Sequence, residues 1–217
     1  MGLFENKIKQ FPKIFDWVER QDVSRLSNFL LDKERCNRLF VASGGSFSAA
    51  VYAEQLSADK GIMSHALTPL LYAGSGFAHV AARTLLISAS GYNNDILRAY
   101  DNGCRAEEQE VGAVVLTSKG RLQTLMQEND ANSLFGFDIP TGRDGFLSST
   151  TVLAFYTLLY RAFGHAELSS VRTDISEQEQ EEINGFVNRL KRISLDELTE
   201  HEAFLHKLEG VDSFFVL

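Results

Sequence analysis

Short apolar runs alternate with helical stretches between residues 36 and 165, and this repetition constrains the fold more than any other feature of the sequence. The runs are nearly continuous in apolar residues and lie at 38–42, 62–67, 83–88, 111–117 and 134–139. Strands of this kind are typical of a parallel sheet covered by helices on both faces. The repetition therefore predicts an α/β fold, a doubly wound three-layer sandwich around a five-stranded parallel sheet.

Helical periodicity follows most of these runs, as at 95–108 and along the long apolar stretch 146–163. Crossovers in such sheets are right-handed, and we expect a doubly wound, flavodoxin-like sheet with the strand order 2-1-3-4-5. In that order the first and third strands flank the point where the order reverses, which is where open parallel sheets bind ligands. We therefore expect a ligand site after the runs 38–42 and 83–88.

The segments on either side of this domain have different patterns. Residues 1–35 carry apolar side chains at spacings of three and four, which predicts a helical lead. Residues 166–210 are predicted to form an acidic helical connector, because the segment 174–209 contains ten acidic residues and only four basic ones. Residues 211–217 read as a strand. We expect four parts, 1–35, 36–165, 166–210 and 211–217.

Composition excludes several classes of protein. The formal net charge is −8, so the chain lacks the basic surface that nucleic acids require, and we expect no nucleic-acid partner. The apolar runs are too short and interrupted to cross a membrane. No secretory signal is visible, and the two cysteines, Cys36 and Cys104, form neither a disulfide framework nor a metal cluster. These features favour a cytoplasmic protein without a metal site.

Two loops rich in serine and glycine follow the first and third runs. They are Ser43-Gly44-Gly45-Ser46-Phe47-Ser48 and Ser88-Ala89-Ser90-Gly91-Tyr92-Asn93-Asn94-Asp95. Each precedes a predicted helix, where free backbone N–H groups and the positive end of the helix dipole favour a phosphate. Alternatively, the serines and Asn93 only cap helices and the glycines only permit tight turns. Their matching positions in the sheet favour a ligand site.

Other phosphate and nucleophile motifs fit these loops less well. The sequence has no G-x-x-x-x-G-K-[ST] motif, and the first loop is not G-x-G-x-x-G. A nucleophile elbow requires G-x-S-x-G after a strand, and Gly44-Gly45-Ser46-Phe47-Ser48 ends in serine. A serine hydrolase that uses Ser46 therefore stays as a remote alternative, which requires a histidine and an acid to converge on this hydroxyl.

Two further motifs complete a set that resembles a known family. The fourth run ends in Leu116-Thr117-Ser118, and Gly142-Arg143-Asp144-Gly145-Phe146-Leu147-Ser148-Ser149-Thr150 follows the fifth. With the two serine loops, these motifs resemble the SIS (sugar isomerase) phosphosugar-binding family. The sequence is most similar to the first of the two SIS domains in the isomerase half of glucosamine-6-phosphate synthase.

The resemblance implies a sugar-phosphate ligand, no cofactor, and assembly as a homo-oligomer, most simply a dimer. It implies that the ligand lies against residues of these loops, with Gly45 and Asn93 standing where the family has threonines and Ala89 and Tyr92 where it has Gln and Glu. The implied ligand-binding residues are Ser43, Gly44, Gly45, Ser46, Ser88, Ser90, Asn93 and Ser148.

The function that follows is phosphosugar binding as part of an aldose–ketose isomerase or a related enzyme. The alternative is a sensor without catalysis that controls a partner. Isomerisation needs an acid and a base, and the weak candidates are Glu54, His65 and Asp144, for which a role without catalysis, at the surface or in the core, is the alternative. In the synthase these groups belong to the second SIS domain. Since residues 213–217 resemble the run 38–42, we expect the chain to be the N-terminal portion of a longer tandem protein, or a divergent remnant of one.

Overall fold

A five-stranded parallel sheet forms the centre of the computed structural model, which describes residues 10–32, 37–74, 83–106, 110–129, 133–141 and 149–164. The strand order is β2-β1-β3-β4-β5, and every neighbouring pair is parallel. This confirms the predicted α/β class and the flavodoxin-like order. The strands are β1 (Asn37–Ala42), β2 (Met63–Leu67), β3 (Arg83–Ser88), β4 (Glu110–Val115) and β5 (Ser133–Gly136).

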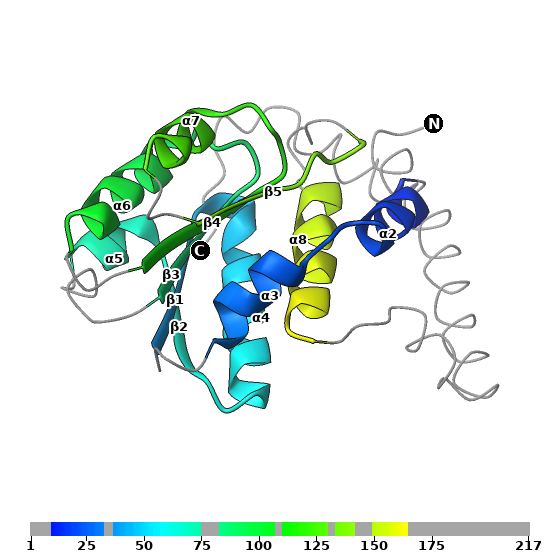
Figure 1. Ribbon diagram of the computed structural model, residues 1–217, viewed down its shortest axis with the longest axis horizontal. Coiled ribbons are helices and arrows are strands. Elements are labelled where there is room, and N and C mark those ends of the chain that lie inside the picture. Colours follow the sequence, from blue (N-terminus) through cyan, green and yellow to red (C-terminus); the bar gives the residue numbers. More distant parts are fainter. Residues whose placement is uncertain are drawn as a thin grey trace, which may run out of the picture. The chain divides into compact units, whose positions relative to one another are not determined.

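Helices cover both faces of the sheet and complete the predicted three layers (Figure 1). One face carries α5 (Pro69–Gly74), α6 (Asn94–Cys104) and α7 (Arg121–Gln127). The other carries α2 (Phe11–Glu19), α3 (Ser24–Leu31), α4 (Phe47–Asp59) and α8 (Ser149–Ala162). Helix α8, apolar on nearly all sides in the sequence, packs against α2, α3 and α4.

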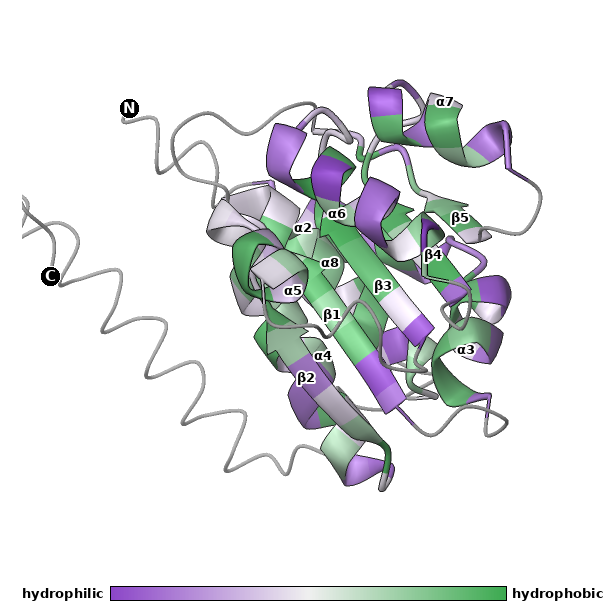
Figure 2. Ribbon diagram, turned by 90° about the vertical axis from the view of Figure 1, so that its left-hand side faces the viewer, coloured by the Kyte–Doolittle hydropathy of each residue, from purple (hydrophilic) through white to green (hydrophobic). Residues whose placement is uncertain are grey.

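Burial of the strands follows their place in the sheet. Strand β3 is buried at every position, and β1 is buried from Arg38 onward, because helices cover these central strands on both faces. Figure 2 shows both strands as hydrophobic along most of their length, with hydrophilic residues at one end. Edge strand β2 exposes Met63 and His65, so it is less completely buried than the central strands.

Two differences between the predicted and the observed elements concern β5 and α5. The fifth run was expected to extend to residue 139, but β5 ends at Gly136, and two further backbone hydrogen bonds hold Phe137 to Val115 and Ile139 to Leu116. Helix α5 was not predicted at all. It has only six residues, and its first turn is held by the Leu71 N–H, which donates to the Thr68 hydroxyl.

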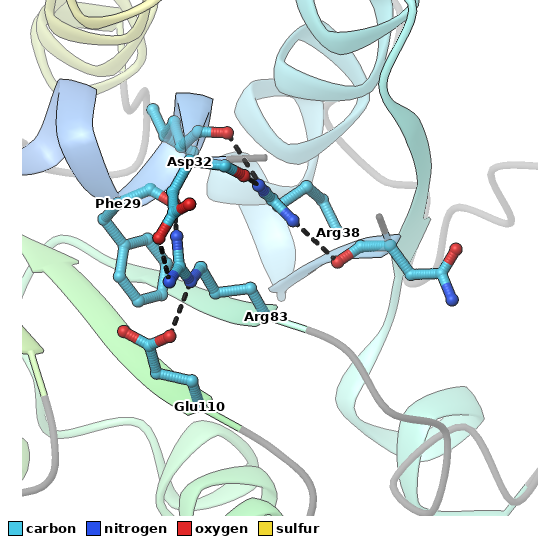
Figure 3. Close-up of polar contacts among 7 residues, drawn as sticks. Phe29, Asp32, Arg38, Arg83 and Glu110 are labelled. Carbon is cyan, nitrogen blue, oxygen red and sulfur yellow. Dashed lines mark hydrogen bonds and ion pairs between the residues drawn. The ribbon is translucent and has the colours of Figure 1, made fainter. Parts of the chain in front are cut away.

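Arg83 joins the C-terminal end of α3 to the start of the sheet (Figure 3). It is the first residue of β3, and it donates to the Phe29 carbonyl at 3.0 Å. The same guanidinium forms ion pairs with Asp32 at 2.7 Å and with Glu110 at 2.6 Å. One buried side chain therefore connects α3, β3 and β4.

Arg38 makes a similar connection from β1. Its guanidinium donates to the Leu30 carbonyl at 3.0 Å and to the Asp32 carbonyl. The last carbonyls of a helix have no partner within the helix, and cations also interact favourably with its C-terminal dipole end. The buried arginines thus satisfy groups that α3 leaves open and fix this helix against the sheet.

Arg161 fixes helix α2 in a comparable way. It lies in the last turn of α8, and its guanidinium donates to the Val18 carbonyl and, at 2.9 Å, to the Gln21 carbonyl. Ile14 and Val18 are fully buried on the inner face of α2. The helices of the predicted lead 1–35 therefore pack on α8 and on the sheet. The predicted segments 166–210 and 211–217 lie outside the described residues, so the domain boundaries stay predictions.

None of the helices that the structure describes is both long and apolar enough to cross a membrane.

Candidate functional site

A cavity of about 460 Å³ opens at the carboxyl ends of the parallel strands. Strands β1 and β3 are neighbours at the point where the strand order reverses. The cavity lies at the loops that connect β1 to α4 and β3 to α6. Six of the eight predicted ligand-binding residues line it. The lining is Ser43, Gly45, Ser46, Ile87, Ser88, Ala89, Ser90, Asn93, Leu116, Thr117, Asp138, Ile139 and Thr151.

The first loop turns sharply between β1 and α4. Ser43 is still extended, and Gly44 then adopts a φ of +57°, a conformation that favours glycine. A single 3-10 turn, Gly44–Ser46, leads into α4. Ser46 lies at the N-cap of α4, yet its side chain makes no capping hydrogen bond. Ser46 therefore lines the cavity, and its hydroxyl is not used to cap α4.

Gly44 is the predicted binding residue that faces a different hollow. It lines a groove beside the cavity together with Val51, Tyr52 and Tyr156. The rings of Tyr52 and Tyr156 stack there with their centroids 4.6 Å apart. Burial, assisted by Tyr160 and Tyr156, raises the pKa of Tyr52, so this phenol is neutral at physiological pH. Gly44 shapes the loop, and Gly45 is the glycine that reaches the cavity.

The second loop presents two hydroxyls that are already used as acceptors. The Ser88 hydroxyl accepts from the Gly91 N–H, and the Ser90 hydroxyl accepts from the Tyr92 N–H, each at 3.2 Å. A hydroxyl that accepts a hydrogen bond still has its own O–H to donate. Since both serines line the cavity, the loop is organised to offer O–H donors to a ligand.

Asn93 lines the cavity and also begins helix α6. Its side-chain oxygen accepts from the Asp95 N–H at 2.8 Å and from the Ile96 N–H at 3.2 Å, which makes it the N-cap of α6. The two readings of this residue, cap and ligand-site residue, are thus compatible. The asparagine that replaces the threonine of the family motif supplies the cap that starts the helix.

Gln123 supports the second loop, a role that the sequence did not indicate. This buried side chain donates from Nε2 to the Thr117 carbonyl at 2.7 Å. Its Oε1 lies where a β-carbon on Gly91 or Gly120 would be, 2.1 Å and 2.2 Å from those positions. At Gly120 a β-carbon would also lie 2.5 Å from the Ser90 carbonyl oxygen, so the backbone itself requires glycine there. At Gly91 the positive φ of +67° favours glycine, and a β-carbon would displace the Gln123 amide.

Asp138 and Thr151 are cavity residues that sequence reasoning missed. Thr151 lies in the first turn of α8, and Asp138 follows β5, with its Oδ1 accepting from the Ser118 N–H. The signal for Asp138 was present, since ligands bind beyond the carboxyl ends of all strands near the reversal point. The fifth run was expected to continue through residue 139, and this hid the loop position of Asp138.

The charge of the cavity lining is unusual for an anion site. Within the described part of the chain, the lining holds no lysine, arginine or histidine, and Asp138 is its one ionisable side chain. Hydroxyls, backbone N–H groups and the N-terminal ends of α4 and α6 are thus the groups that can stabilise a negative ligand.

The catalytic candidates lie elsewhere or outside the described residues. Glu54, on α4, and His65, on β2, do not line the cavity, and they pair with each other at 3.8 Å between Oε1 and Nδ1. Asp144 and the predicted ligand residue Ser148 lie outside the residues that the structure describes. A serine hydrolase that uses Ser46 requires a histidine beside this hydroxyl. No histidine lines the cavity among the described residues.

Comparison with known proteins identifies the class of fold. No family profile and no curated protein sequence matches this chain. Solved structures do match, among them the tagatose-6-phosphate ketose/aldose isomerase from Escherichia coli, with a TM-score of 0.61 and 18% sequence identity over 75% of this chain and 47% of the isomerase. The NanR protein of Vibrio vulnificus, complexed with ManNAc-6P, has a TM-score of 0.61 and 12% identity over 84% of this chain and 68% of NanR.

A third match is a protein from E. coli CFT073 in complex with a sugar phosphate, with a TM-score of 0.54 and 17% identity over 76% of this chain and 94% of that protein. The fold is therefore one that phosphosugar isomerases and sugar-phosphate-binding proteins share, as the resemblance to the SIS family predicted. The chain spans about half the length of the tagatose-6-phosphate isomerase. The nearer likeness to glucosamine-6-phosphate synthase stays a prediction.

Proposed function

We propose that this chain binds a phosphorylated sugar, with the phosphate against the loops that follow β1 and β3. The observation that carries the proposal is the cavity at the reversal of strand order, because both serine loops line it. Ser46, Ser88 and Ser90 supply hydroxyl donors, and α4 and α6 begin beside them. Donors of this kind stabilise a phosphate without a basic side chain.

The rest of the lining suits the sugar portion of such a ligand. Thr117, Thr151 and Asp138 offer polar groups, and Ile87, Leu116 and Ile139 offer apolar surface. A sugar has both hydroxyls and apolar C–H groups, so a mixed lining of this kind fits it. The two structural neighbours that were solved with sugar phosphates bound, one of them with ManNAc-6P, support the same class of ligand.

A ligand series tests this proposal directly. Melting temperature and calorimetric affinity are measured with hexose and pentose phosphates and with the same sugars without phosphate. We expect the phosphosugars alone to raise the melting temperature, because a ligand that binds the folded state stabilises it. If none of the phosphosugars binds, the proposal is wrong.

Replacement of Ser46 by alanine tests the position of the phosphate. Ser46→Ala removes one hydroxyl donor from the cavity, and a hydrogen bond to a charged group contributes about 1.5 kcal/mol, which corresponds to about tenfold in affinity. The melting temperature of the free protein stays unchanged, because this side chain makes no capping bond. Ser64→Ala on β2, outside the cavity, is the matched control and leaves the affinity unchanged. Equal affinities for the two variants contradict the placement.

Two uses of the bound sugar phosphate follow, and they need separate tests. As part of an isomerase, the chain holds the phosphate while an acid and a base move a proton between adjacent carbons. As a sensor, it binds without reaction and controls a partner. The second use is favoured by the placement of Glu54 and His65, which pair with each other outside the cavity.

Proton NMR in D2O distinguishes the two uses. Any phosphosugar that binds is incubated with the full chain, and the spectra are followed for conversion between aldose and ketose and for deuterium uptake beside the carbonyl. Conversion that is faster than in a protein-free sample identifies an isomerase. Binding without conversion identifies a sensor, or a chain whose catalytic groups come from elsewhere in the protein.

A further inference from the structure

Asp138 holds a fixed position at the rim of the cavity. Backbone hydrogen bonds hold the residues on both sides of it, from Phe137 N to Val115 O at 2.9 Å and from Ile139 N to Leu116 O at 3.4 Å. The Asp138 carboxylate accepts from the Ser118 N–H through Oδ1. Among the described residues, Oδ2 has no such partner, so it is the oxygen that a ligand can meet.

The position of Asp138 is remote from the proposed phosphate position. The serine loops follow β1 and β3, and Asp138 follows β5, which is separated from β3 by β4. Neighbouring strands are about 4.8 Å apart, so the loop after β5 lies about 10 Å from the loop after β3. Because the serine loops and Asp138 line the same cavity, a sugar phosphate anchored on these loops can place its other end near Asp138.

The charge of Asp138 is not balanced within the described cavity lining, which contains no cationic side chain. A carboxylate accepts hydrogen bonds from sugar hydroxyls. It repels a second phosphate or a carboxylate at a short distance, and the repulsion is stronger in a partly enclosed site than in water. The same group thus favours one end of a neutral sugar and opposes the same end of an acidic one.

We infer that Asp138 is a specificity-determining residue, which restricts the site to monophosphates of neutral sugars and excludes sugar bisphosphates and phosphorylated sugar acids. The inference rests on the proposed function, since it requires the phosphate at the serine loops. It adds the class of sugar that the site selects, and it assigns the selection to one side chain.

The test compares matched ligands that differ by one anionic group. Affinities are measured by calorimetry for fructose 6-phosphate against fructose 1,6-bisphosphate and for glucose 6-phosphate against 6-phosphogluconate. Inorganic phosphate is added as the minimal probe. The proteins are the full chain, Asp138→Asn and Asp95→Asn. Asparagine keeps an oxygen for the Ser118 N–H, removes the charge, and replaces the second oxygen by an NH2 group that donates to a ligand instead of accepting.

We expect the unaltered chain to bind fructose 6-phosphate and glucose 6-phosphate more tightly than their more acidic partners. The expected ratio of affinities is about tenfold or more, which corresponds to about 1.4 kcal/mol. Asp138→Asn reduces this ratio to near one. Asp95 lies in the first turn of α6 and does not line the cavity, so Asp95→Asn changes the affinity for both members of a pair alike and keeps the ratio.

The outcomes distinguish the proposed function from the inference about Asp138. If neither a phosphosugar nor inorganic phosphate binds, the proposed function is wrong and the inference falls with it. If the neutral-sugar monophosphates bind, but the unaltered chain binds the bisphosphate and the phosphorylated sugar acid equally well, the inference is wrong and the proposed function stands. The same holds if the ratio survives in Asp138→Asn.

Discussion

Arg83 meets two carboxylates and a helix carbonyl at the start of strand β3 (Figure 3). Burial lowers the pKa of this guanidinium, but the hydrogen bonds with Asp32 and Glu110 outweigh this loss, and its pKa is raised overall. The ring of Phe29 adds a further contact, with the guanidinium carbon 5.2 Å from the ring centroid. Arg83 is therefore charged at any physiological pH and keeps its ion pairs with Asp32 and Glu110.

Replacement of Arg83 by methionine is expected to destabilise the fold by about 2 kcal/mol. The change leaves Asp32 and Glu110 without their shared partner, and the cost is below the 3–5 kcal/mol of a fully buried pair because both carboxylates are about one-third exposed. Urea unfolding measures it. Arg105→Met is the matched control, since it breaks an exposed pair with Asp101 and costs less than about 0.5 kcal/mol. Equal losses contradict the assigned role of Arg83.

At the scale of the elements, the second serine loop and the loop after β4 fit together through one amide. Gln123 lies between Gly91 and Gly120 and donates to the Thr117 carbonyl. Thr117 itself lines the cavity. The geometry of the proposed phosphate loop therefore depends on a helix that does not touch the ligand.

Gly91→Ala tests this dependence, with Gly61→Ala as a control of equal backbone strain. Both glycines have positive φ, +67° and +69°, so alanine costs about 1 kcal/mol at either. Only at Gly91 does the new β-carbon meet Gln123, whereas nothing lies within 4 Å at Gly61. Gly91→Ala is expected to cost about 1 kcal/mol more, because the Gln123 bond to Thr117 is lost.

Phosphosugar affinity separates the two alanine variants further. Gly91→Ala weakens binding because the displaced amide shifts the loop that holds Ser88 and Ser90. Gly61→Ala leaves binding unchanged, since its turn lies after helix α4 and away from the cavity. Equal stability losses together with equal affinities contradict the supporting role of Gln123.

The elements themselves were largely predictable from the sequence, because burial on both faces makes parallel strands nearly continuous in apolar residues. Strand β3 begins and ends where the sequence predicts, and the strand order is the expected flavodoxin-like one. The serine loops followed from the same order. Contacts between distant segments were not predictable. Arg38 and Arg83 are only the first residues of two apolar runs in the sequence, which does not indicate their bonds to α3. The sequence around Gln123 likewise does not indicate its contacts with Gly91 and Gly120.

At the scale of the whole molecule, the N-terminal helices belong to the same packed body as the sheet. Ile14 and Val18 of α2, and Leu26 and Leu30 of α3, are almost completely buried. Arginines from β1, β3 and α8 bind the carbonyls at or just beyond the C-terminal ends of these helices. The contacts are numerous enough that the lead and the sheet should unfold together.

Deletion of residues 1–32 is expected to abolish cooperative unfolding. It exposes the apolar surface beneath α2 and α3 and leaves the buried Arg38 and Arg83 without their helix partners, which is costly for buried charges. Circular dichroism melts of the shortened and the full chain measure the effect. A shortened chain that melts cooperatively and binds phosphosugar with full affinity shows instead that the lead is separable.

The absence of a cationic side chain from the described cavity lining also affects how a ligand arrives. Basic sites attract anions over long distances and speed their capture. Residues 1–166, which hold the cavity, carry 16 basic and 17 acidic side chains, a net charge of −1, so the field of this unit neither attracts nor repels a phosphate dianion strongly, and binding depends on contacts formed after entry. Physiological salt screens charges over about 8 Å. Capture by this site should thus depend little on salt, whereas capture by a lysine- or arginine-based site is slowed by it.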